Sequence, residues 1–322
     1  MMIHRSLAAF SLMIVATWAG TAWAQSVGSL PWLSAKASAI QSGGASAQQA
    51  ARAELIRVGE KTFATPTYPP SLAAALMPVV TSGNTRAKLN AAIVLERAAA
   101  RTASPSLLPA VTALLDDRCD AVALWGVKAA RPLIAAGGAT SSWLAPQVVA
   151  TVKAHPSSGP IAEEAYAALL CDPLQPMLVD SILATLQMRI SAYGTGVPPP
   201  SPFAEHQIPA YLIATCWPQA TPAGRMRILT ALGKFTCATA GAVADGSSDG
   251  AIVEMARLNA EGLEAIGNRL PSDALVTAAK SLSTLEPSRA ATIPTDCKAL
   301  TAALADLGVV LEPRRALRPG TD

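Results

Sequence analysis

The sequence predicts an all-α fold, and three observations support this prediction. First, apolar residues recur at steps of three and four along most of the chain, as in Val122, Gly126, Ala129 and Leu133, which is the period of a helix with one buried face. Second, no stretch alternates apolar and polar residues with the excess of β-branched side chains that a strand shows. Third, alanine, which has the highest helix propensity, is abundant throughout.

Residues 1–24 have the three-part layout of a secretory signal peptide. Arg5 makes the start positive, an apolar run fills residues 7–19, and 22–24 supply the small residues that a signal peptidase needs. The run is about 13–15 residues long, whereas a bilayer span takes roughly 20. We therefore expect a periplasmic or secreted protein whose mature chain begins near Gln25. The alternative is an uncleaved N-terminal anchor.

The helices are expected in order along the rest of the chain. Residues 25–47 look flexible, and the pattern predicts a first helix over 48–63. Predicted pairs follow at 70–81 with 85–101, 105–117 with 120–135, 140–154 with 160–170, and 173–193 with 205–216. Further helices are predicted at 222–238, 250–269, 272–284 and 295–308. The tail, 311–322, is basic and proline-containing, and we expect it to fray.

One predicted pair, over about residues 105–135, carries a recognisable pattern. Its residues are Pro109, Val111, Leu114, Leu115, Asp117, Val122 and Gly126. This spacing resembles a HEAT repeat, a helical pair that stacks on its neighbours to form an α-solenoid. HEAT units often carry an arginine that pairs with the turn aspartate of a neighbouring unit, and that place is Ala123 here.

The resemblance implies an irregular HEAT-like α-solenoid of antiparallel helix pairs over residues 48–193, an architecture used mostly for binding. Prolines fall inside or near the start of the first helix of four pairs: Pro78, Pro109, Pro146 and Pro176. A proline inside a helix bends its axis, and HEAT units commonly carry such a bend. The alternatives are a compact helical bundle and an α/α-toroid.

Residues 194–204 interrupt the helical pattern, because they are too rich in proline and glycine for a helix. Two interpretations remain open. The segment is either a boundary between the repeats and a C-terminal helical region over 205–310, or a long loop within one continuous domain.

Composition and charge exclude some classes of function. The formal net charge is +3 and falls to about +2 when the signal, with Arg5, is removed, so the dense basic face of a nucleic-acid-binding protein is absent. Aromatic residues make up 4% of the chain, whereas helical toroid enzymes that act on glycans line their clefts with aromatic side chains. No nucleic-acid partner is expected.

Catalytic and metal-binding patterns are sparse. His155 and His206 lie in no catalytic signature, and no GxSxG elbow occurs. Glu163 and Glu164 are adjacent, so they diverge on a helix and cannot flank one glycosidic bond. Residues 245–250 resemble the start of an EF-hand loop, but the bidentate glutamate of its twelfth position is Ala256. We therefore expect no catalytic residue, no metal and no cofactor.

Four basic residues are candidates for a binding surface: Arg97, Arg101, Lys128 and Arg131. They form a modest basic ridge for an acidic peptide or glycan if the second helices line one face, and otherwise they are ordinary solvated residues. Trp125 is expected in the core. The sequence thus favours an exported, non-enzymatic scaffold that binds another protein. The alternative is an exported α/α-toroid enzyme that acts on a polysaccharide or cell-wall fragment.

The five cysteines are candidates for disulfides, because exported proteins meet an oxidising compartment. If consecutive helices run antiparallel, Cys171 and Cys216 lie at one end of the array. Cys119, Cys237 and Cys297 then lie at the opposite end. The favoured pairs are therefore Cys171 with Cys216 and Cys237 with Cys297. The alternative is that all five are buried thiols.

Overall fold

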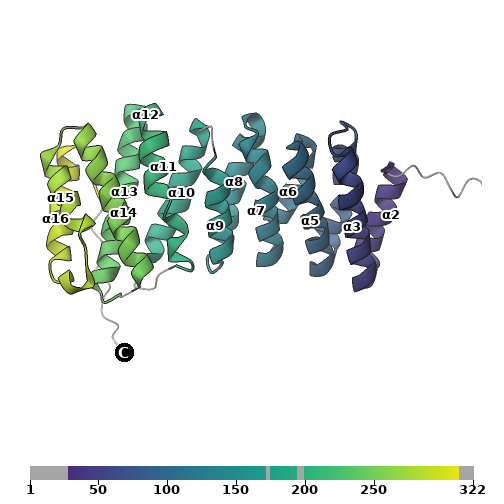
Figure 1. The fold of residues 1–322 in the computed structure, drawn as a ribbon, viewed down its shortest axis with the longest axis horizontal. Helices are drawn as coiled ribbons and strands as arrows, with labels where there is room; N and C mark the ends of the chain where they lie inside the picture. The colour runs from purple at the N-terminus through teal and green to yellow at the C-terminus, as the bar shows by residue number, and fades with distance from the viewer. Residues whose placement is uncertain (1–27, 172–174, 194–198, 248, 312–322) are drawn as a thin grey trace, which may run out of the picture. The chain divides into compact units, whose positions relative to one another are not determined.

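The computed structural model describes residues 28–171, 175–193, 199–247 and 249–311. Every regular element within these ranges is a helix and none is a strand (Figure 1), which confirms the all-α prediction. The chain divides into two compact units, residues 1–114 and 115–322. The expected signal peptide over 1–24 and the basic tail from residue 312 lie outside the described residues.

The first unit is built from helical hairpins. Its elements are α2 (Leu30–Ser42), α3 (Ala45–Thr62), α4 (Tyr68–Ser82), α5 (Thr85–Thr102), the 3-10 turn η1 (Pro105–Leu107) and most of α6 (Leu108–Leu115). Helix α2 packs on α3 and α4 on α5, while α2 also packs on α4 and α3 on α5. The two hairpins therefore stack in the same order, first helix on first helix and second on second.

Helix α2 corrects the expectation that residues 25–47 are flexible. Leu33, Ala37 and Ile40 are spaced by four and three residues and are buried, so α2 has the apolar face that packing requires. The stretch that looked like a linker is a tight turn at Gly43 and Gly44 between two helices.

The same turn recurs in the second hairpin. Gly43 N–H donates to the Ala39 carbonyl, and Gly83 N–H donates to the Val79 carbonyl, at 3.0 and 2.9 Å. A Cβ at either glycine would collide with the carbonyl oxygen that its own N–H contacts. Glycine is therefore required at both places by close backbone approach, since neither residue has a positive φ.

The second unit begins with helices that pack on their next-but-one neighbours. They are α7 (Asp120–Ala135), α8 (Gly138–Ala154), α9 (Gly159–Leu169) and α10 (Pro176–Tyr193). Helix α7 packs on both α8 and α9, and α8 packs on both α9 and α10. Buried aliphatic side chains such as Val122, Leu133 and Leu144 fill the space between them.

The C-terminal part of this unit is a group of four helices. They are α13 (Pro222–Ala244), α14 (Gly250–Arg269), α15 (Asp273–Ser283) and α16 (Ile293–Asp306), with the 3-10 turn η4 (Pro287–Arg289) before the last. Helix α13 packs on α10, α14 and α16, and α15 packs on α14 and α16. Phe235 is fully buried and lies against Tyr193 of α10, with ring centroids 5.6 Å apart.

The segment predicted as one helix over 205–216 differs from that prediction. It consists of η2 (Pro202–Glu205), α11 (Ile208–Tyr211), the π-helical turn η3 (Leu212–Cys216) and α12 (Trp217–Gln219). Pro209 stands at the start of α11, where its missing N–H costs no helical hydrogen bond. The helical run therefore starts three residues later than expected and continues to Gln219.

The prolines of the first helices lie where the sequence placed them. Pro78 and Pro146 are inside α4 and α8, and Pro109 and Pro176 stand at the starts of α6 and α10. A further proline inside a helix, Pro132 of α7, belongs to a second helix. No helix of the described ranges is long and apolar enough to span a membrane.

Candidate binding groove

Two facing stripes of side chains line a groove in the first unit. Arg52, Ile56 and Glu60 are spaced by four residues on α3, and Ile93, Arg97 and Arg101 have the same spacing on α5. Residues four apart lie on one face of a helix, and α3 packs against α5. The stripes, with Phe63, enclose a cavity of about 650 Å³, which is within the usual range for ligand sites.

The groove is strongly positive. Three guanidinium groups line it against the single carboxylate of Glu60. Arg97 Nε lies 3.5 Å from Glu96 Oε2, with the arginine side chain 61% exposed. Within the described part of the chain, Arg52, Arg101 and Glu60 form no ion pair. Arg97 and Arg101 are like charges four residues apart, an arrangement that costs a helix about 0.2–0.5 kcal/mol, although Arg101 in the last turn of α5 also interacts favourably with the helix dipole.

The walls between the charges are apolar. Ile56 and Ile93 are half-buried and Phe63 is almost fully buried, at 2% exposed. The Phe63 ring packs edge-on against Tyr68, with centroids 5.6 Å apart, so it forms part of the floor. The groove therefore combines guanidinium donors at its rim with aliphatic surface inside, which suits an anionic ligand that also carries an apolar group.

The other two predicted ridge residues have partners in the second unit. Lys128 Nζ lies 4.7 Å from the centroid of the Trp125 ring, a cation–π distance. Arg131 Nη1 lies 3.5 Å from Glu164 Oε1. The expectation that Trp125 is a core residue is only partly right, because its ring is half-buried and covered by Lys128. Arg97 has a similar contact with Glu96, but Arg97 and Arg101 also line the groove, which makes them the stronger candidates.

Comparison with models of protein families, with curated proteins and with solved structures found no match.

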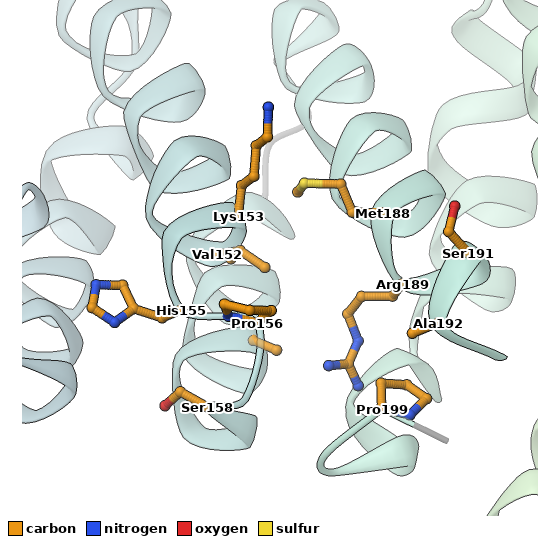
Figure 2. A pocket seen from close by; sticks show the side chains of 11 residues that line it. Val152, Lys153, His155, Pro156, Ser158, Met188, Arg189, Ser191, Ala192 and Pro199 are labelled. Carbon is orange, nitrogen blue, oxygen red and sulfur yellow. The ribbon is translucent and has the colours of Figure 1, made fainter. Parts of the chain in front are cut away.

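A second cavity, of about 340 Å³, lies in the second unit between α8, α9 and α10. Its lining is mostly small and apolar, and its polar members include Lys153, His155 and Arg189. Figure 2 shows that these side chains do not converge, because the His155 ring and the Arg189 guanidinium lie on different sides and Lys153 points away from both. No carboxylate lines this cavity.

His155 has a structural role at the end of α8. Its Nδ1 lies 2.7 Å from Asp120 Oδ1, and its Nε2 lies 3.0 Å from the Asp117 carbonyl oxygen. Thr151, one turn earlier, donates to the Leu115 carbonyl at 3.2 Å. Both ring nitrogens thus contact the start of α7 and the turn before it. His155 is the C-terminal cap of its helix, directly before Pro156.

Arg189 and Glu205 form a buried ion pair beside this cavity. Arg189 Nε donates to Glu205 Oε1, and Nη2 donates at 2.9 Å to the carbonyls of Pro200 and Ser201. Tyr193 donates to the Pro202 carbonyl at 2.9 Å. Burial raises the pKa of Glu205 above its usual value, and the adjacent guanidinium opposes that rise. Residues on both sides of the 194–204 loop belong to the second unit, and these contacts fasten its described end to α10.

The remaining predicted residues belong to the second unit. His206 is half-buried and stacks on Phe203, with ring centroids 4.7 Å apart. Asp249 is the N-terminal cap of α14 and accepts from Ala251 N–H at 2.8 Å. No group of three or more His, Cys, Asp or Glu residues that could hold a metal gathers within the described ranges.

All five cysteines are present as thiols. The Cys171 carbonyl accepts a hydrogen bond from the Tyr211 hydroxyl at 2.8 Å. Tyr211 lies five residues before Cys216. Cys237 of α13 and Cys297 of α16 lie within interaction distance of each other, where these two helices pack. The two disulfides remain predictions.

Sequence reasoning missed Arg52, Glu60 and the Arg189–Glu205 pair. A signal for the first two existed, because Arg52, Ile56 and Glu60 repeat the four-residue spacing of Ile93, Arg97 and Arg101. The pair had no signal, because nothing in the local sequence pattern shows that residues 200–205 contact α10.

Proposed function

We propose that this protein is an exported, non-enzymatic scaffold that binds a protein partner in the groove between α3 and α5. The observation that supports it most is the set of three guanidinium groups, Arg52, Arg97 and Arg101, around one carboxylate. Arginine clusters recognise acidic segments through charge-assisted, often bidentate hydrogen bonds. The partner in this proposal is an extended segment rich in aspartate and glutamate.

The apolar walls refine the partner's chemistry. Ile56 and Ile93 lie between the charged residues of their stripes, so an aliphatic side chain between two carboxylates complements the groove. A sugar ring is a poorer fit, because the one aromatic residue of the lining, Phe63, is almost fully buried and offers no exposed face. This difference favours a peptide over an acidic glycan.

The proposal includes the finer architecture, a HEAT-like α-solenoid. It is supported within the first unit by the repeated glycine turns and the ordered stacking of two hairpins. The next-but-one packing of α7 to α10 supports it within the second. The alternative of an α/α-toroid enzyme calls for convergent acidic or histidine side chains, and the two cavities described above contain one carboxylate between them.

The proposal is tested with a fluorescent peptide in which glutamate and leucine alternate. Binding by the purified protein is followed by fluorescence anisotropy. Arg97→Glu/Arg101→Glu should weaken it at least tenfold, and added salt should weaken it further, since exposed charges are screened. The matched control is Arg57→Glu/Arg86→Glu, the same charge change at exposed positions of the same regions outside the groove lining.

Two outcomes would contradict the proposal. Equal loss of binding in both double variants would show that net charge, and not the groove, attracts the peptide. Tighter binding of polygalacturonate than of the peptide would indicate an acidic glycan as the ligand.

A further inference from the structure

A second feature of the molecule, unrelated to the groove, lies between α13 and α16. Gly233 of α13 allows the two helices to approach closely, because a Cβ there would come within 2.5 Å of Leu304 Cδ1. Cys237 lies one turn after Gly233, and Cys297 lies two turns before Leu304. Residues four or seven apart share a face of a helix, so both cysteines lie on the faces through which α13 and α16 pack.

The two thiols are in contact with each other and with a hydroxyl group. The Cys297 side chain and the Thr301 hydroxyl both lie within interaction distance of the Cys237 sulfur, where α13 packs on α16. Thr301 donates to the Cys297 carbonyl at 2.8 Å, which holds it next to both cysteines. Cys237 and Cys297 are each partly exposed, so a reagent in solvent can reach them.

The surroundings of the Cys237 thiol differ from those of the buried Cys216 thiol. The hydrogen bond from Cys297 lowers the pKa of Cys237 below its usual value, burial opposes this shift, and Thr301 adds to it. Burial alone raises the pKa of Cys216 to about 12. Since the thiolate is the reactive form of cysteine, Cys237 has the environment of an attacking thiol and Cys216 that of an inert one.

We propose that Cys237 and Cys297 form a redox-active dithiol that is oxidised to a disulfide by exchange with a disulfide-bearing oxidant. The Cys237 thiolate attacks one sulfur of the oxidant's disulfide, and the other sulfur leaves as a thiolate. The Cys297 thiol then loses its proton to solvent, and its sulfur attacks Cys237 in the mixed disulfide. This step expels the oxidant's second thiolate, so two electrons pass from the cysteine pair to the oxidant.

The product closes a loop of about 60 residues that contains α14 and α15, a length at which a disulfide restricts the unfolded chain substantially. We therefore expect the oxidised protein to melt on the order of 10 °C higher than the reduced protein.

The test uses the purified full chain, reduced and then treated with oxidised glutathione. Peptide mapping should find Cys237 linked to Cys297. In Cys297→Ser, which lacks the resolving sulfur, a glutathione adduct should accumulate on Cys237. In Cys237→Ser, the adduct on Cys297 should form at least tenfold more slowly.

Alkylation rates give a second measurement that does not depend on disulfide formation. In the reduced protein, iodoacetamide should modify Cys237 at least tenfold faster than Cys216. Thr301→Val should slow the reaction at Cys237, and Thr301→Ser, which keeps the hydroxyl, should restore most of the rate. Equal rates at Cys237 and Cys216, or oxidation that links Cys237 to a cysteine other than Cys297, would overturn the proposal.

Discussion

Arg189 of α10 and Glu205 of η2 form an ion pair that is almost completely buried, with side chains 6% and 0% exposed. The same guanidinium donates to the carbonyls of Pro200 and Ser201. One side chain of a regular helix thus contacts two backbone carbonyls at the end of the proline-rich loop and the carboxylate of Glu205. The pair belongs to the framework of the second unit.

Removing the carboxylate of this pair should destabilise the protein severely. Glu205→Ala leaves the Arg189 guanidinium buried without its partner, which costs about 3–5 kcal/mol of unfolding free energy. Urea denaturation measures the loss. Glu261 on α14 is exposed, so Glu261→Ala should change stability by less than about 0.5 kcal/mol. Similar effects of the two substitutions would show that the pair is not important for the fold.

Ionisation of the Cys216 thiol in the unfolded chain should lower the free energy of unfolding as the pH rises into the alkaline range. Burial raises the pKa of its thiol to about 12, whereas in an unfolded chain a thiol ionises above about pH 8.5. Its contribution to stability is therefore complete below about pH 8.5 and decreases as pH rises toward the folded value. Cys216→Ala should flatten the fall in unfolding free energy between about pH 8.5 and 10. Cys119→Ala is the control, and equal slopes in the wild type and Cys216→Ala would contradict the prediction.

Alanine substitutions at Gly43 and Gly44 test the close approach of the Gly43 backbone to the Ala39 carbonyl. A Cβ at Gly43 meets the Ala39 carbonyl oxygen, whereas a Cβ at Gly44 meets nothing within 4 Å. Gly43→Ala should therefore cost about 1–3 kcal/mol, as overpacking does, and Gly44→Ala less than about 0.5 kcal/mol. Thermal unfolding followed by circular dichroism distinguishes them. A loss at Gly44 as large as that at Gly43 would argue against the turn described here.

Calcium should not affect stability, although residues 245–250 resemble the start of a calcium loop. Asp249 caps α14 through Ala251 N–H, so Asp249→Ala should cost about 1 kcal/mol with or without calcium. A ligand at a hundred times its dissociation constant would add ~2.7 kcal/mol, which differential scanning calorimetry detects easily. A calcium-dependent rise in melting temperature that disappears in Asp249→Ala would overturn this prediction.

Long helices in which apolar residues recur at steps of three and four were predictable from the sequence. The predicted helix over 250–269 coincides with α14, because its buried residues Ile252, Met255 and Leu263 repeat at helical steps between an aspartate cap and a loop. Helix α2 was missed, because Gly43 and Gly44 and many small residues made a folded segment look like a linker. Its apolar stripe at Leu33, Ala37 and Ile40 was nevertheless present in the sequence.

The groove was predicted only in part. Arg97 and Arg101 were predicted as binding residues on one helix, but the third arginine of the groove, Arg52, lies on α3. Periodicity within one helix does not show which other helix packs against it. The predicted ridge also joined them to Lys128 and Arg131, which instead contact Trp125 and Glu164. Which basic side chains share one surface depends on how the helices pack against each other, and a single sequence does not specify that packing.

The most direct test of the proposed scaffold is photo-crosslinking from the groove in cells that make the protein. A photo-reactive residue at position 93, inside the groove lining, is compared with one at position 57, outside it. We expect a crosslinked protein with an acidic segment from position 93 alone, and we expect this product to disappear when Arg97→Glu/Arg101→Glu is added. The same product from both positions, or a product unaffected by the double charge reversal, would contradict the assignment of the groove as the binding site.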